Sequence, residues 1–182
     1  LAWELRFEDV ARALTLSETA RELASQGEAA QQPYLTGLAE SLRNLGHCHE
    51  RLANYHYAIS LLLEALSLFE QIGNQAQQAP VLYLLGGNYR SIGNYVEALA
   101  YTLASLEKSR AWGDRYSEAK GLNIVGLIYQ SVGDFTQAMS YFLKAHSIYE
   151  EINHKQGQGD TLSNIGEVFF ELGDYENALS NG

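Results

Sequence analysis

The stretch RSIGNYVEAL at positions 90–99 decides the fold, because close copies of it return at a fixed distance along the chain. QSVGDFTQAM follows at 130–139 and FELGDYENAL at 170–179, and a looser copy, ERLANYHYAI, precedes it at 50–59. The period is therefore 40 residues, with no slippage over the four copies. Self-similarity at a constant period of this size is typical of repeat proteins, in which each unit packs on its neighbours in the sequence.

One unit reads as two helices joined by a short turn. Apolar or small residues of the third copy recur at i, i+3, i+4 and i+7, which places them on one face of a helix: Leu122, Val125, Gly126 and Tyr129. A second set shows helical spacing again: Phe135, Ala138, Phe142 and Ala145. Between the two sets, Gly133 favours a helix end, and Asp134 is a typical N-cap for the next helix. The pattern predicts an antiparallel helical hairpin.

The other copies repeat this punctuation. The turn recurs as Ala53-Asn54, Gly93-Asn94, Gly133-Asp134 and Gly173-Asp174. Small residues recur at one phase of each helix: Gly46, Gly86, Gly126 and Gly166 in the first, and Ala58, Ala98, Ala138 and Ala178 in the second. Glycine inside a helix costs roughly 0.5–1 kcal/mol relative to alanine, so its recurrence predicts a close approach of the paired helix. Alanine in the first turn predicts a less favourable helix end there.

These residues resemble the tetratricopeptide repeat. The likeness lies in the Leu-Gly-x-x-Tyr pattern of the first helix, the Gly-Asp/Asn-Tyr/Phe turn and the Ala-x-x-x-Phe-x-x-Ala pattern of the second helix, and it covers about 33–182. It implies an all-α, right-handed superhelical solenoid of antiparallel helix hairpins. The expected parts are a partial, divergent hairpin at 1–32 and units at about 39–78, 79–118, 119–158 and a truncated 159–182. Units of 40 residues exceed the usual 34, and resemble those of kinesin light chains, Leu-Gly-Asn-repeat adaptors and bacterial signalling proteins.

A few residues depart from the repeat pattern. His49 stands where the first helix elsewhere has an aromatic residue, and Thr102 and Ser105 replace the phenylalanine and alanine of the second helix. We expect looser packing at these places. Trp112 is expected to be a packing residue near a unit boundary.

The resemblance also implies a ligand groove, because the first helices line the inner face of such solenoids. The expected groove residues lie beside the packing glycine and one to one and a half turns later: Arg43, Asn44, His47, Arg51, Tyr83, Leu84, Gly87, Arg90, Asn123, Ile124, Leu127, Gln130, Ser163, Asn164 and Glu167. Arginine binds carboxylates through two parallel hydrogen bonds, and asparagine can pair with a peptide backbone. We expect a peptide groove whose arginine-rich N-terminal half takes an acidic side chain or a C-terminal carboxylate, and whose middle takes an apolar group. The alternative is a solvated concave face whose partner binds elsewhere.

Composition narrows the remaining classes of function. A net charge of −10 argues against nucleic acid and anionic membranes as partners, since both require clustered Lys and Arg. Cys48 is the only cysteine, which excludes an intrachain disulfide and a Cys-rich zinc site and fits a cytoplasmic location. No apolar run approaches the roughly 18–20 residues of a membrane span, and no signal peptide is visible. Because the sequence opens without Met and stops in mid-pattern, we expect it to be a piece of a longer chain.

Two motifs invite a chemical interpretation. In HCH at 47–49, the two histidines are two residues apart and point to nearly opposite sides of a helix, so they do not share a metal. KQGQGD at 155–160 has two glycines and a lysine, but it lacks the spacing of a phosphate loop and a preceding strand, and we expect it in an inter-repeat turn. We expect no metal, no cofactor and no catalytic residue.

The predicted function is a protein- or peptide-binding scaffold and not an enzyme. Long, Tyr-rich units of this kind resemble the sensory or regulatory parts of larger bacterial signalling proteins, which is the setting we expect. Two alternatives stay open. One is a free-standing adaptor, and the other is self-association as a homodimer through the C-terminal end, where Phe169, Tyr175 and Leu179 are apolar.

Overall fold

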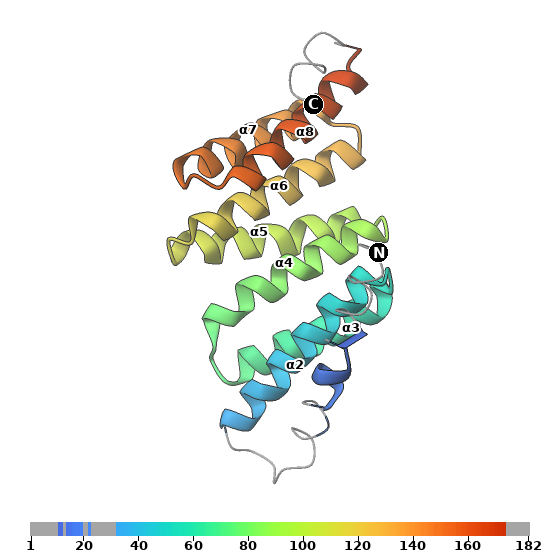
Figure 1. Cartoon of the computed structure of the whole chain (residues 1–182), viewed down its shortest axis with the longest axis vertical. Coiled ribbons are helices and arrows are strands. Elements are labelled where there is room, and N and C mark those ends of the chain that lie inside the picture. Colours follow the sequence, from blue (N-terminus) through green and yellow to red (C-terminus); the bar gives the residue numbers. More distant parts are fainter. Residues whose placement is uncertain (1–10, 13, 20–21, 23–31, 174–182) are drawn as a thin grey trace. The chain divides into compact units, whose positions relative to one another are not determined.

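Every element in the described part of the chain is a helix. The computed structural model describes residues 11–12, 14–19, 22 and 32–173 (Figure 1). Its main elements are α2 (Gln32–Arg51), α3 (Tyr55–Gln71), α4 (Gln75–Ser91), α5 (Tyr95–Ala111), α6 (Arg115–Ser131), α7 (Phe135–Glu151) and α8 (Lys155–Glu171). The predicted all-α class is confirmed, and the sequence calls at Trp3, Tyr175, Ala178 and Leu179 lie outside the described residues.

The 40-residue period has a simple structural origin. Each of the helices from α3 to α8 has 17 residues, and each is followed by a three-residue turn. Two helices and two turns therefore make one period. The expected unit starts at 79, 119 and 159 fall inside α4, α6 and α8, whose first residues are Gln75, Arg115 and Lys155.

The middle residue of every turn between the helices α2 to α8, and of the turn after α8, has a left-handed backbone. These residues are Ala53 (φ 59°), Gly73 (69°), Gly93 (78°), Gly113 (66°), Gly133 (81°), Asn153 (54°) and Gly173 (77°). This conformation lets the next N–H bond back to the helix that has just ended, as when the Asp134 N–H donates to the Tyr129 carbonyl at 2.9 Å. Glycine takes it without a steric penalty, which explains why glycine stands at five of these seven positions.

The chain divides into two compact units, residues 1–94 and 95–182. In the first unit α2 packs against α3, α3 packs against α4, and α2 also contacts α4. In the second unit α5 packs against α6, α6 against α7 and α7 against α8, and α6 also contacts α8. The first helices of successive hairpins therefore lie side by side within each unit (Figure 1).

The predicted close approach at the packing glycines is confirmed where the structure resolves it. A Cβ added to Gly46 would lie 2.7 Å from Leu62 Cγ, and one added to Gly126 would lie 2.5 Å from Phe142 Cε1. Both distances are shorter than any real Cβ contact, so the missing side chain is what lets α2 meet α3 and α6 meet α7. Gly86 and Gly166 are buried as well.

The residues that depart from the repeat pattern still pack. The ring of His49 lies against Tyr57 edge-on, with centroids 4.6 Å apart. Thr102 and Ser105 are 0% and 2% exposed. The Thr102 hydroxyl donates to the Ala98 carbonyl at 2.7 Å, so burial of this polar group leaves it satisfied.

Two predictions about local structure are wrong. Trp112 is 63% exposed, because it opens the turn between α5 and α6 and its side chain points away from the core. KQGQGD does not form a turn but begins α8, and the actual turn is 152–154. Gly157 in this motif serves packing, since a Cβ there would lie 2.5 Å from the ring of Tyr149.

Candidate functional site

The predicted groove residues of the first unit lie on α2 and α4 and keep some exposure. Asn44, His47 and Arg51 are exposed, and the remaining five are partly exposed: Arg43, Tyr83, Leu84, Gly87 and Arg90. We call this set the first strip. It arises because neighbouring residues such as Leu42 and Leu45 turn into the core, which leaves these positions on the outer side of the same helices.

Arg43 links the two helices of the first strip. Its guanidinium donates to Gln77 Oε1 on α4 and, at 3.3 Å, to Asn44 Oδ1. Farther along, Gly87 contributes no side chain, and Arg90 Nε is buried without a hydrogen-bond partner among the described residues. This region therefore combines a fixed arginine, open space and a guanidinium group with unused donor capacity.

The second strip consists of the predicted residues on α6 and α8, which are partly or fully exposed: Asn123, Ile124, Leu127, Gln130, Ser163, Asn164 and Glu167. Two polar bridges join the helices here. Asn164 Nδ2 donates to Asn123 Oδ1 at 2.9 Å, and Gln130 Nε2 donates to Glu167 Oε2 at 3.3 Å.

The asparagine bridge leaves hydrogen-bonding capacity on both partners. Once Asn164 Nδ2 and Asn123 Oδ1 are joined, the amide N–H groups of Asn123 and the carbonyl oxygen of Asn164 can still bond elsewhere. An extended peptide offers one N–H and one C=O per residue. The pair therefore has the donor and the acceptor that a peptide unit requires, and the partly exposed Ile124 and Leu127 lie on the same helix as Asn123.

Sequence reasoning missed Phe170, which is 60% exposed on α8. It stands 40 residues after Gln130 and 80 after Arg90, both of which are predicted groove residues. The period therefore contained the signal, which was lost because the position holds a different residue type in each copy. Phe170 adds an aromatic surface to the second strip.

The two strips differ in charge. The first strip carries Arg43, Arg51 and Arg90, whereas the second carries Glu167, with Glu171 following on the same helix. Within each strip this favours ligand groups of opposite sign.

The motif at 47–49 places its members in three different environments. His47 is exposed, Cys48 is 7% exposed, and His49 packs on Tyr57. Burial raises the pKa of the Cys48 thiol, against a smaller opposing effect of Arg51, so the reactive thiolate is disfavoured. Among the described residues, no group of three His, Cys, Asp or Glu side chains is close enough to hold a metal. None of the described helices is long and apolar enough to cross a membrane.

Comparison with solved structures identifies similar folds at low sequence identity. A Rap protein in complex with Competence and Sporulation Factor superposes with a TM-score of 0.83 at 20% identity, over 99% of this chain and 49% of that one. BtubC from P. vanneervenii gives 0.80 at 19% identity, over 97% and 72%. The Rap conjugation gene regulator of plasmid pLS20, in complex with the Phr* peptide, gives 0.80 at 18% identity, over 99% and 48%. The chain thus spans about half the length of these two Rap proteins.

No curated protein sequence matches the chain significantly. A family model does match it, over residues 37–111 and 117–182, and that model describes the tetratricopeptide repeat. The match includes the glycine-centred turns and the small residues of the packed helices, and it spans most of the sequence. The chain therefore belongs to the tetratricopeptide repeat family.

Proposed function

We propose that the chain binds a peptide, or an extended segment of a partner protein, along the exposed face of its first helices. The general class, a protein- or peptide-binding scaffold, is the one that the family match supports. The observation that carries the peptide proposal is the Asn123–Asn164 bridge, which presents a donor and an acceptor side by side on two adjacent helices. An extended main chain can use both without any requirement on its side chains.

Specificity comes from the residues around these main-chain contacts. In the first strip, Arg43 is already fixed by Gln77, so its guanidinium loses little conformational entropy when it binds a carboxylate. Tyr83, Leu84, Ile124 and Leu127 supply apolar contact. We therefore expect ligands with an acidic side chain or a C-terminal carboxylate at the first strip and an apolar side chain beside α6.

The biological setting that we propose is the regulatory part of a bacterial signalling protein. The Rap regulator that shares this fold is in complex with a peptide, which makes control by a peptide a reasonable hypothesis for this chain. We expect the scaffold to have no chemistry of its own, so that any catalytic or DNA-binding output resides elsewhere. Reproducible turnover by the chain, lost on a single substitution, would contradict this.

Selection from a random peptide library tests the proposal. Peptides selected against the chain should lose affinity for the triple variant Arg43→Ala, Arg51→Ala, Arg90→Ala and for the double variant Asn123→Ala, Asn164→Ala. The loss should be about tenfold per removed charged contact and smaller for the neutral ones. A matched control replaces exposed residues of second helices, Glu64→Ala and Lys144→Ala. Affinity that survives both groove variants, or that falls equally in the control, would refute the groove.

A second candidate function is self-association, and one observation favours it. An apolar hollow of about 460 Å³ lies between α7 and α8, lined mainly by Phe135, Met139, Leu143, Ile165 and Phe169. A second copy could cover it. Light scattering over a range of concentrations should then show a dimer that Phe169→Asp dissociates, and a monomer at all concentrations would remove this candidate.

A further inference from the structure

A surface at one end of α5 and α6, away from both strips, combines exposed aromatic rings with cations. Trp112 is 63% exposed and Tyr116 is 44% exposed. Arg110 and Lys120 flank them in the sequence, and we call these four residues the Trp112 surface. The positions 40 residues before and after Trp112 hold Ile72 and Ile152, which are only partly exposed. An exposed tryptophan at this turn is thus particular to one repeat.

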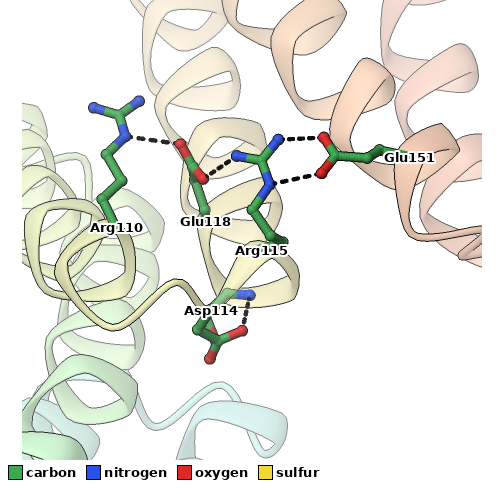
Figure 2. Close-up of polar contacts among 6 residues, drawn as sticks. Arg110, Asp114, Arg115, Glu118 and Glu151 are labelled. Carbon is green, nitrogen blue, oxygen red and sulfur yellow. Dashed lines mark hydrogen bonds and ion pairs between the residues drawn. The ribbon is translucent and has the colours of Figure 1, made fainter.

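A buried carboxylate holds the arginine of this surface in place. Glu118 is 8% exposed, and it accepts from Arg110 Nε at 2.8 Å and from Arg115 Nη1 at 2.5 Å. Arg115 in turn donates to both carboxylate oxygens of Glu151 on α7, at 3.2 and 2.5 Å (Figure 2). The network connects α5, α6 and α7, so the orientation of Arg110 is fixed before any partner arrives.

Arg110 has donors left over. Only its Nε donates to a described residue, and Figure 2 shows its two terminal nitrogens turned away from Glu118. Its side chain is 56% exposed. A guanidinium that is anchored through Nε and open at its terminal nitrogens can accept an incoming carboxylate at little entropic cost.

The aromatic part of the surface is equally well supported. The Tyr116 ring lies with its centroid 5.0 Å from that of His154 and 6.4 Å from that of Tyr149. Lys120 Nζ lies 5.6 Å from the Tyr116 centroid, which adds a second cation at the rings. Tyr116 is therefore a supported aromatic side chain rather than a freely rotating one.

The local charge is opposite to that of the molecule. Residues 108–120 contain Lys108, Arg110, Arg115 and Lys120 against Asp114 and Glu118, a net charge of +2 in a chain of net charge −10. Glu151, which pairs with Arg115, reduces this to +1. Trp, Tyr and Arg are also the residue types that contribute most to binding energy at protein interfaces.

From these features we infer that the Trp112 surface is a second docking site, which takes an acidic segment of a partner protein. A carboxylate of that segment pairs with the terminal nitrogens of Arg110, and a neighbouring apolar or aromatic side chain covers Trp112. This site is separate from the peptide strips and does not depend on the function proposed for them.

Fluorescence of Trp112 tests the inference. The chain has two tryptophans, so Trp3→Phe leaves Trp112 as the only emitter. The probes are two synthetic hexapeptides, Glu-Glu-Leu-Phe-Glu-Glu and its counterpart with lysine in place of every glutamate. We expect the acidic peptide to shift the Trp112 emission to the blue saturably and the basic peptide to leave it unchanged. Arg110→Gln should weaken the acidic peptide about tenfold, because a charge-assisted hydrogen bond is lost.

Controls separate this site from the strips and from net charge. Lys144→Gln removes one exposed cation on α7 and should bind like the parent. The Arg43, Arg51, Arg90 triple variant should keep the fluorescence response even where it loses strip ligands. The inference fails if the acidic peptide gives no saturable shift, if both peptides shift the emission equally, or if Arg110→Gln binds as tightly as the parent.

Discussion

At the scale of single residues, the left-handed turn position makes a prediction about Ala53. Its φ of 59° is unfavourable for any residue with a Cβ, by roughly 1–2 kcal/mol, whereas glycine pays mainly a smaller entropic cost. Ala53→Gly should therefore raise the free energy of unfolding by about 0.5–1 kcal/mol. Urea unfolding measures this. The reverse change at an equivalent turn, Gly133→Ala, should lower it, and a loss of stability in Ala53→Gly would contradict the account.

Glycines inside helices separate into two kinds, and substitution distinguishes them. A Cβ at Gly126 would lie 2.5 Å from Phe142 Cε1, so Gly126→Leu overpacks the contact and should cost at least about 1–3 kcal/mol. Gly159 in α8 has no atom within 4 Å of an added Cβ. Gly159→Ala should instead stabilise by about 0.5–1 kcal/mol, because alanine favours the helix. Equal melting temperatures for the two variants would count against the packing role of Gly126.

At the scale of elements, each turn has to begin a helix as well as end one. Asp134 Oδ1 accepts from the Gln137 N–H at 3.0 Å, whereas Asn54 makes no side-chain cap bond. Asp134→Ala should therefore cost about 1 kcal/mol, and Asn54→Ala distinctly less. Thermal unfolding of the two variants side by side checks this, and a larger loss in Asn54→Ala would refute it.

The ion network across α5, α6 and α7 predicts a pH dependence. Hydrogen bonds from Arg115 lower the pKa of Glu151 below its usual 4.5. A carboxyl whose pKa is lowered by folding stabilises the protein above its unfolded-state pKa, and this contribution disappears as pH falls through the folded value. Stability should therefore fall more steeply below about pH 4.5 in the parent than in Glu151→Gln. Parallel acid-unfolding curves would remove the network from the account.

The helices between the turns were predictable because their signals are local and repeated. Leu122, Val125 and Gly126 lie in the core as their spacing required, and Gly126 meets the paired helix as its phase implied. Exposure was harder to predict. Trp112 has the composition of a core residue, yet it opens a turn that gives it nothing to pack on. Composition cannot distinguish these cases without the exact ends of the helices.

The 20-residue rhythm of turns was also within reach of the sequence. Ile72-Gly73-Asn74 and Trp112-Gly113-Asp114 have the same apolar–Gly–Asn/Asp form as the turns inside hairpins. Reading them as turns would have placed KQGQGD inside α8. What the sequence did not contain is the pairing of side chains across helices, such as Asn123 with Asn164, since that depends on how α6 and α8 cross.

At the scale of the whole molecule, the repeated hairpin builds two units with the same local design and different surface chemistry. Each brings first helices together, and each exposes the predicted groove positions on them. The core positions of the repeat are held nearly constant, while the exposed positions vary from copy to copy: His47, Gly87, Leu127 and Glu167 share one phase. Constancy in the core and variation on the first helices is the arrangement expected of a binding scaffold.

The central claim is that ligands bind to the first helices, and nuclear magnetic resonance tests it most directly. A peptide selected from a random library would be titrated into the isotope-labelled chain, with the side-chain amides of Asn123 and Asn164 and the guanidinium groups of Arg43 and Arg51 as reporters. The account predicts saturable shifts at these groups and at backbone amides of α2, α4, α6 and α8. Shifts confined to α3, α5 and α7, with the four side chains unchanged, would contradict it.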